Sequence, residues 1–378
     1  MIRGSIHMLI LFMIVILVAL GLQWYSLRKA GDHRNIRYEC KPSVRACEPG
    51  EEFLVLSNVA NVGLRSSPSF RIEEHFPQNL NVLESEQFNV RWLTKEHRIY
   101  YSTVVMHGHQ QVKRSLRASI AQRGEYCFSY AVFYAGDFLG FREYVYRMEN
   151  DSRIVIYPQK LENAELPKTF SDALDDLARK KQLLEDPISV CGYRDYTGAE
   201  PMRQISWKQS AVHNALIVKQ FDPVWRQDVL IALDTELHGD FDEYLSQLEL
   251  CFSLTRTVCE HFEQRNIAYR LVTNAVITGE LSGFSSSGGM GGSFRKILYA
   301  LGSARKGSIG SVEELMHAAC SGVNRCEMII LISTHRDQYV ECVLDNVQEA
   351  RGRKIITLFA DQLTPACCDV PEKGDVKA

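Results

Sequence analysis

A dense group of charged and aromatic side chains lies in residues 193–219, which read YRDYTGAEPMRQISWKQSAVHNALIVK. Gly198 and Pro201 interrupt any helix here, so the stretch predicts a turn-rich segment that runs into a strand near residue 216. Trp207 brings a large apolar surface and an indole N–H that needs a partner when it is buried. The side chains that could form ion pairs here are Arg194, Arg203, Asp195 and Glu200. Composition alone favours a surface loop with one anchoring tryptophan.

A second group of candidate residues follows the apolar run 229–233. Asp234 begins the sequence Asp-Thr-Glu-Leu-His, and Ser333 ends a later apolar run. Hard cations such as Mg²⁺ prefer carboxylate and hydroxyl oxygens, so Asp234 is a candidate metal ligand. The alternative is that Asp234 caps the loop or helix that follows it. A hydrolase using Asp234, His238 and a loop serine is a further alternative, but no spacing places a base beside a nucleophile.

Two glycine-rich stretches suggest phosphate binding. Gly302 and Gly307 have the spacing of a P-loop, but Ser308 and Ile309 occupy the positions where that motif needs Lys and Ser or Thr. No side chain would therefore reach a phosphate. The Gly/Ser-rich residues 279–292 predict a mobile loop at the rim of a sheet rather than a catalytic loop.

Composition narrows the class of protein. The chain has 378 residues, 46% of them apolar, which is typical of a globular protein with two or three domains. Its net charge of −3 does not favour nucleic-acid binding, and no motif points to a small-molecule substrate. The 11 cysteines form no C-x-x-C pair, which favours free thiols in a reducing compartment.

The N-terminus predicts a single membrane-spanning helix. Residues 8–27 contain no charged side chain, and about twenty helical residues cross a bilayer core of roughly 30 Å. Trp24 and Tyr25 lie where an interfacial belt would be. The basic residues that follow are Arg28, Lys29, Arg34, Arg37 and Lys41. By the positive-inside rule they place the body of the protein in the cytoplasm. A cleaved signal peptide, with Arg3 as its basic region, is the alternative.

The rest of the chain predicts two further architectures. Short β-rich runs suggest a β-sandwich, with strands at 53–59, 88–93, 98–106, 116–120, 126–134 and 145–157. Alternating strands and helices then predict a doubly wound parallel sheet, with strands at 229–233, 268–276, 328–333 and 354–359 and helices at 241–266, 294–304, 311–321 and 335–351. The predicted division is 1–35 membrane anchor and basic flank, 36–160 β-sandwich, 161–225 linker helix (172–185) and polar segment, and 226–378 α/β domain.

The polar segment resembles the signature of the family known as domain of unknown function 58. The residues that match are Tyr196, Gly198, Arg203, Ile205, Trp207, Lys208, Ser210 and Ala211. The departures are Ala199 and Ser206, where the family has Asp, and His213, which stands near the family's Arg. Residues 123–126 and 137–141 resemble the pattern that precedes the motif in this family.

That resemblance implies a von Willebrand factor A-like fold for residues 226–378. Such domains bind a cation through Asp-x-Ser-x-Ser, and here Glu236 and His238 replace the two serines. The implied cofactor is therefore none, or Mg²⁺ at a degenerate site that includes Asp234.

The resemblance also implies a function as a membrane-anchored, non-enzymatic adaptor. Its partner would be a MoxR-type AAA+ ATPase, and the two would assist the assembly or maturation of other proteins. The implied docking residues are Arg194, Asp195, Tyr196, Gly198, Arg203, Ile205, Trp207, Lys208 and Ser210. In this interpretation Trp207 is a buried anchor and Arg203 forms a bidentate pair. Two alternatives are an exported, adhesion-like binding module that needs a cation, and a hydrolase.

Overall fold

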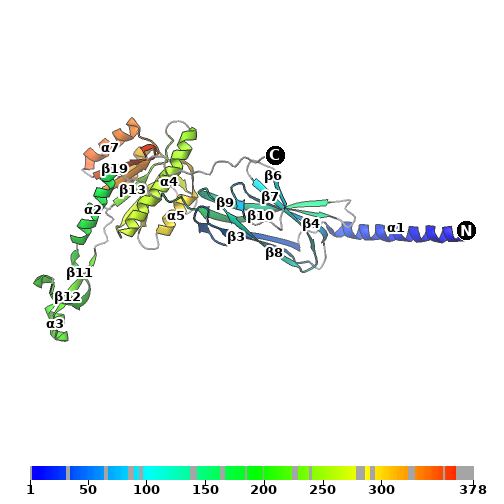
Figure 1. The fold of residues 1–378 in the computed structure, drawn as a ribbon, viewed down its shortest axis with the longest axis horizontal. Helices are drawn as coiled ribbons and strands as arrows, with labels where there is room; N and C mark the ends of the chain where they lie inside the picture. The colour runs from blue at the N-terminus through cyan, green and yellow to red at the C-terminus, as the bar shows by residue number, and fades with distance from the viewer. Residues whose placement is uncertain are drawn as a thin grey trace. The chain divides into compact units, whose positions relative to one another are not determined.

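We describe the chain from a computed structural model (Figure 1). The structure describes residues 2–30, 35–63, 67–83, 89–92, 97–136, 143–161, 167–183, 185–198, 200–223, 229–237, 241–277, 286–289, 294–321, 328–351 and 354–362. It divides into two compact units, Met1–Gln159 and Lys160–Ala378. Each unit is described separately below.

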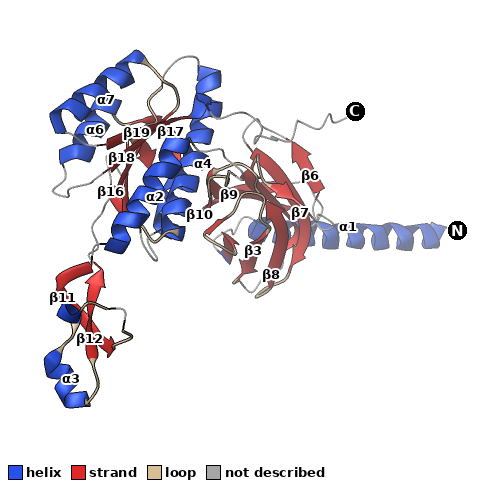
Figure 2. Cartoon of the chain, turned by 60° about the vertical axis from the view of Figure 1, so that its left-hand side comes forward, coloured by secondary structure: helices blue, strands red, loops and turns tan. Residues whose placement is uncertain are grey.

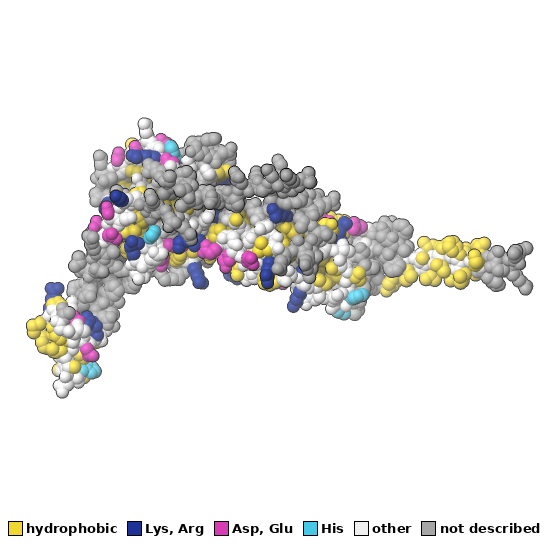
Figure 3. All heavy atoms as spheres, viewed as in Figure 1, with side chains coloured by type: hydrophobic (Ala, Val, Ile, Leu, Met, Phe, Trp, Pro, Cys, Tyr) yellow, Lys and Arg dark blue, Asp and Glu magenta, His cyan; other side chains and the backbone are white. Residues whose placement is uncertain are grey.

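The first unit begins with the helix α1 (Ile2–Ala30). Its segment Met8–Tyr25 is long and apolar enough to cross a membrane, and only a small part of it is buried. Its large apolar side chains form the yellow stretch at one end of Figure 3. The predicted N-terminal apolar helix is therefore confirmed, and its length and composition fit either a membrane anchor or a signal sequence.

Two β-sheets make up the remainder of the first unit. The first has the order β1-β3-β8-β5, comprising β1 (Ile36–Pro42), β3 (Phe53–Asn61), β8 (Gln111–Ser119) and β5 (Asn81–Val82). The second has the order β2-β10-β9-β4-β7-β6, comprising β2 (Ala46–Cys47), β10 (Glu143–Ile156), β9 (Gly124–Gly136), β4 (Ser67–Pro77), β7 (His97–Met106) and β6 (Asn89–Trp92). Each of the six predicted strands corresponds to an observed one. By contrast, β1, β2, β4 and β5 were not predicted. The strand β4 includes residues 67–69, which read as a turn because they are rich in Ser and Pro.

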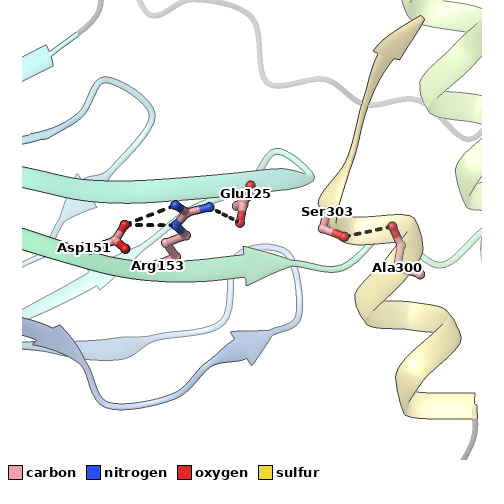
Figure 4. Close-up of polar contacts among 5 residues, drawn as sticks. All are labelled: Glu125, Asp151, Arg153, Ala300 and Ser303. Carbon is pink, nitrogen blue, oxygen red and sulfur yellow. Dashed lines mark hydrogen bonds and ion pairs between the residues drawn. The ribbon is translucent and has the colours of Figure 1, made fainter. Parts of the chain in front are cut away.

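Side chains from both sheets share one core, as in a β-sandwich. Along β3, buried and more exposed residues alternate, so one face of the strand points inward. Val55 and Leu116 of the first sheet pack in the same cluster as Phe76 and Phe128 of the second. At the surface, Arg153 of β10 pairs with Asp151 and Glu125 (Figure 4).

A buried ion pair also joins the two sheets. The Arg114 guanidinium of β8 lies 3.0 Å from Oε2 of Glu74 in β4, and both side chains are almost fully buried. Arg114 also donates to the hydroxyl of Ser57 at 3.0 Å, and the Tyr38 hydroxyl donates to the Glu74 carboxylate at 3.0 Å. Burial, with the Glu74 charge as a second cause, raises the pKa of Tyr38 above its usual range. Tyr38 therefore stays protonated and remains a donor to Glu74.

The second unit contains the elements that position the candidate site. Its helices are α2 (Lys168–Leu183), η2 (Met202–Gln204), α3 (Trp207–His213), α4 (Phe241–Gln264), α5 (Phe294–Ser303), α6 (Val312–Ser321), α7 (Gln338–Arg351) and η3 (Ala360–Gln362). Its strands are β11 (Glu185–Asp195), β12 (Ile217–Pro223), β13 (Val229–Leu233), β14 (Tyr269–Thr273), β15 (Ala275–Ile277), β16 (Ser286–Gly289), β17 (Ala304–Ser308), β18 (Met328–Ser333) and β19 (Lys354–Phe359).

A five-stranded sheet with the order β16-β14-β13-β18-β19 forms the centre of this unit. β13 pairs in parallel with both β14 and β18, and β18 pairs in parallel with β19. Alternate residues of β13 face opposite sides, so Ile231 packs with α4 and α5, whereas Ala232 packs with α6 and α7. Helices therefore cover both faces of the sheet (Figure 2). The continuous apolar runs of the sequence reflect this burial on both sides.

Two details of this unit differ from the sequence-based expectation, and a third concerns the glycine pair with P-loop spacing. Part of the Gly/Ser-rich loop forms β16, which runs antiparallel to β14, so the sheet is mixed rather than wholly parallel. Gly302 and Gly307 lie where α5 passes into β17, whereas a P-loop passes from a strand into a helix. At the end of α5 the Ser303 hydroxyl donates to the Ala300 carbonyl (Figure 4). Phe170 of α2 packs against Phe262 of α4, so α2 contributes to the core of this unit. The sequence had predicted only a linker helix here.

Candidate functional site

Three polar side chains meet at the carboxyl edge of the central sheet. Asp234 follows β13, Asn274 follows β14, and Ser333 ends β18, and all three residues are 0% exposed. Parallel strands bring their carboxyl ends to one edge. The strand that follows β13 in the chain, β14, lies on one side of β13 in the sheet, and β18 lies on the other side of β13. This is a topological switch point, which is where sheets of this kind bind ligands.

The Asp234 carboxylate is the acceptor at the centre of this group. Its Oδ2 accepts a hydrogen bond from the Ser333 hydroxyl at 2.9 Å. Its Oδ1 accepts two, from Asn274 Nδ2 at 2.7 Å and from the backbone N–H of Glu236 at 3.0 Å. The last contact shows that Asp234 caps the loop that follows it, which is the alternative that the sequence left open.

The orientation of the Asn274 amide follows from its other partners. Its Oδ1 accepts from the backbone N–H of Thr235 at 2.8 Å, and its Nδ2 donates to the Gly310 carbonyl at 3.0 Å. A backbone N–H can only donate and a carbonyl can only accept, so the amide cannot be reversed without losing both contacts. The Nδ2 group therefore points at Asp234. We call Asp234, Asn274 and Ser333 the edge hub.

This donor set does not fit the cation that the family resemblance implies. A hard cation needs oxygen lone pairs directed at it, whereas both Asp234 oxygens accept hydrogen bonds and Asn274 presents N–H groups instead of its oxygen. Within the described residues no three His, Cys, Asp or Glu side chains are grouped as a metal site would need. His238 lies outside the described residues.

Glu236 has a different role from that of a cation ligand. Its Oε2 accepts the backbone N–H of Val312 at 2.8 Å, at the first turn of α6. A carboxylate at this position satisfies a free N–H and interacts favourably with the helix dipole. Ser311 also caps α6, because its hydroxyl accepts the N–H of Glu314 at 3.3 Å, as its spacing in the sequence predicts.

Around the edge hub, two loops and the first turn of α7 each present an exposed apolar side chain. Leu237 is 51% exposed, Ile309 is 50% exposed and Tyr339 is 43% exposed. Hydrogen bonds hold two of these residues in place: the Ile309 N–H donates to the Asn274 carbonyl at 2.7 Å, and the Tyr339 hydroxyl donates to Glu313 of α6 at 3.2 Å. Desolvation and the Glu313 carboxylate raise the pKa of Tyr339, so it stays neutral. We call Leu237, Ile309 and Tyr339 the apolar rim.

The polar segment of the sequence forms a hairpin of β11 and β12 with η2 and α3 between them. Arg194 pairs with Glu200, as the sequence suggested, and Thr197 donates to Glu200 through its N–H at 3.1 Å and its hydroxyl at 2.8 Å. The Thr197 hydroxyl, with smaller contributions that include Arg194, lowers the pKa of Glu200 to about 2. Gly198 has a φ of +91°, a left-handed conformation that favours glycine in this turn.

Arg203 is exposed and forms no ion pair with any residue that the structure describes, so its bidentate pair stays a prediction. Another prediction for this segment is wrong, because Trp207 is 61% exposed and is not a buried anchor. The reason is size, since α3 has seven residues, beginning at Trp207, and none of them is buried. Of the other motif residues, Ile205 is buried against β12, while Asp195 and Lys208 are exposed. Ser210 accepts the N–H of Ile217 at 2.9 Å, and the Tyr196 N–H donates to the Leu216 carbonyl, so both tie the hairpin together.

The hydrolase alternative gains no described catalytic group. His238, one of its proposed residues, lies outside the described residues, and no particular loop serine was assigned to it. The cysteines whose side chains are described are all free thiols. Burial raises the pKa of Cys40 and of Cys47 to about 12, which keeps both sulfurs protonated and unreactive.

No protein-family model and no curated protein matches this chain. Among solved structures it is similar to alpha-2-macroglobulin from Salmonella, with 14% identity over 32% of this chain and 9% of that one, at a TM-score of 0.24. A cohesin from Archaeoglobus fulgidus has 12% identity over 32% of this chain and 91% of its own length, at a TM-score of 0.21. The CARDB domain of a Pyrococcus furiosus protein has 10% identity over 31% of this chain and 86% of its own, at a TM-score of 0.19. These similarities carry no conclusion about function.

Proposed function

We propose that the chain is a membrane-anchored, non-enzymatic adaptor that recognises a protein partner at the carboxyl edge of its central sheet. The observation that carries the proposal is the pairing of the edge hub with the apolar rim. The hub is buried and its polar groups bond to one another, while Leu237, Ile309 and Tyr339 expose apolar surface above it. Exposed apolar side chains on a rigid polar support suit protein recognition.

The proposed partner is a MoxR-type AAA+ ATPase. This part of the proposal comes from the resemblance of the polar segment to the domain of unknown function 58 family. A sheet with helices on both faces and a candidate site at the carboxyl ends of β13 and β18 is compatible with the von Willebrand factor A-like fold of that family. The basic residues that follow the apolar segment of α1 favour a cytoplasmic body, where such an ATPase would be present.

The geometry around Asp234 favours this adaptor over the other two candidates. An adhesion-like module would need Asp234 as a cation ligand, yet three donors already occupy its carboxylate. In the hydrolase candidate Asp234 would take part in catalysis, whereas here its carboxylate accepts from the Ser333 hydroxyl and from two N–H groups, as a structural acceptor does.

A binding assay with purified proteins tests the proposal. Full-length protein in detergent is mixed with each purified MoxR-type ATPase of the same organism, with ATP, with ADP and without nucleotide. The variants Leu237→Glu and Ile309→Glu place a charge on the apolar rim. The matched control is Val105→Glu, because Val105 is similarly exposed at 53% but lies on β7 of the first unit.

We expect nucleotide-dependent binding that both rim variants weaken at least tenfold and that the control leaves unchanged. Binding that all three variants retain would place the contact elsewhere. No binding to any ATPase, together with labelling of the exposed Cys342 only from outside the cell, would overturn the adaptor and favour the exported module.

A further inference from the structure

The hairpin of β11 and β12 exposes an unusual set of side chains. Outside α1, the three most exposed large apolar side chains of the described residues are Val212 at 71%, Met202 at 70% and Trp207 at 61%. All three belong to η2 and α3. They lie in none of the hydrophobic core clusters, and in residues 200–219 only Ile205, Ser206, Ile217 and Val218 are buried. Several exposed apolar side chains on one short segment mark a candidate contact site.

Each of these apolar residues is followed directly by a basic one. The resulting group, which we call the α3 tip, consists of Met202, Arg203, Trp207, Lys208, Val212 and His213. Arg203, Lys208 and His213 are exposed, and Arg203 and Lys208 pair with no carboxylate in the described part of the chain. Figure 3 shows yellow and dark-blue side chains together over the segment that carries α3.

The charge of this segment is opposite to that of the whole chain. Residues 193–219 contain four Lys and Arg against two Asp and Glu, a net charge of +2, whereas the chain carries −3. Glu200 is already neutralised by Arg194. The cations of the tip are therefore available to an external anion. An anionic surface with an apolar layer beneath it could bind the basic side chains of the tip and bury its apolar ones.

We propose that the α3 tip is a second membrane contact, which inserts Met202, Trp207 and Val212 between anionic lipids while Arg203 and Lys208 bind their headgroups. Tryptophan prefers the membrane interface, and long basic side chains place their charge in the headgroup layer. Anionic lipids attract Lys and Arg at a cytoplasmic membrane surface. The inference rests on the proposed anchorage by α1, because a tethered chain meets the bilayer at a high effective concentration.

Hydrogen exchange of the full-length protein in lipid nanodiscs tests this contact. The protein is compared in nanodiscs of phosphatidylcholine alone, in nanodiscs of phosphatidylcholine with phosphatidylglycerol, and in a neutral detergent micelle. We expect slower exchange of the peptides that cover residues 200–216 only in the anionic nanodiscs, with the protection lost at high salt.

A pair of charge variants makes the test specific. Arg203→Gln with Lys208→Gln should lower the docking equilibrium constant roughly 30-fold, since each basic residue contributes about 1 kcal/mol at an anionic surface and 1.4 kcal/mol is a factor of ten. The control is Lys113→Gln with Lys168→Gln, which removes the same charge from two other exposed sites and should leave the protection unchanged.

Two results would overturn the inference. Equal protection of the tip in all three environments would mean that protein, rather than lipid, covers it. Exchange that stays fast in anionic nanodiscs would mean that the tip does not reach the membrane. No ATPase is present in this experiment, so a failure of the chain to bind an ATPase would leave its outcome unaffected, and loss of the lipid contact would leave ATPase binding at the apolar rim unaffected.

Discussion

Replacing Asp234 separates a structural role from a metal-binding one. In Asp234→Ala, three donors lose their acceptor inside the protein. The Ser333 hydroxyl can rotate toward another acceptor, but Asn274 Nδ2 and the Glu236 N–H are fixed. A buried donor without a partner costs about 1–3 kcal/mol, so the two fixed donors together should cost about 2–6 kcal/mol of unfolding free energy. That is a large share of the typical stability of a domain, about 5–15 kcal/mol.

Asp234→Asn should cost far less. The new amide oxygen can accept from Asn274 and Glu236, and its NH₂ group can donate to the Ser333 hydroxyl, which also accepts. We therefore expect a loss below about 1.5 kcal/mol, because the remaining bonds only lose the strength that the charge gave them. A metal ligand would behave differently, since a neutral amide there would weaken cation binding about as effectively as alanine.

Scanning calorimetry of the full-length protein in detergent, with and without Mg²⁺, measures both effects. About 1 kcal/mol shifts the midpoint of a unit of this size by roughly 2–4 °C, so Asp234→Ala should lower the midpoint of its transition by roughly 4–24 °C. Asp234→Asn should stay within roughly 6 °C of the wild type, and Mg²⁺ should shift none of the three proteins. The reasoning is refuted if alanine and asparagine are equally damaging, or if Mg²⁺ stabilises the wild type and not Asp234→Asn.

Three further predictions follow from contacts in the two units. Arg114→Met should destabilise the first unit by about 3–5 kcal/mol because it leaves the Glu74 charge buried without its counter-charge. Adding Glu74→Gln should restore much of this loss in urea unfolding. Phe170→Ala should cost about 3–5 kcal/mol in the same assay, since Phe170 is fully buried in the core of the second unit, and an effect near zero would mean that α2 is only a linker. The Glu200 carboxylate has a lowered pKa, so its contacts with Thr197 and Arg194 should be complete above about pH 4.5. These contacts should be lost as the pH falls through about 2, and carbon-detected NMR titration of Glu200 measures this directly.

The elements that were predicted well from the sequence are those whose burial produces a recognisable run of apolar residues. The runs 229–233, 328–333 and 354–359 are continuously apolar because helices cover both faces of their sheet, and their boundaries match the observed strands. The cap of α6 was predictable for a similar reason, since Ser311 and Glu314 lie three residues apart on one turn.

The edge hub was not predictable because its members are far apart in the chain. Asp234 is 40 residues from Asn274 and 99 from Ser333, and only the strand order brings them together. A polar residue directly after an apolar run was the available signal, and it also occurs at many solvent-exposed strand ends. For Trp207 the sequence predicted burial that the structure does not show. A tryptophan is buried only where neighbouring elements supply enough surface to cover it.

The edge hub also bears on how this protein could change its partners. Asn274 holds the backbone of residues 235, 309 and 310 through its side chain and its carbonyl, so the shape of these loops depends on the hub and not on the side chains that the loops expose. Leu237 and Ile309 can then be replaced with little effect on folding. A surface of this kind can diverge rapidly among related proteins, or be redesigned in the laboratory, while the sheet beneath it stays the same.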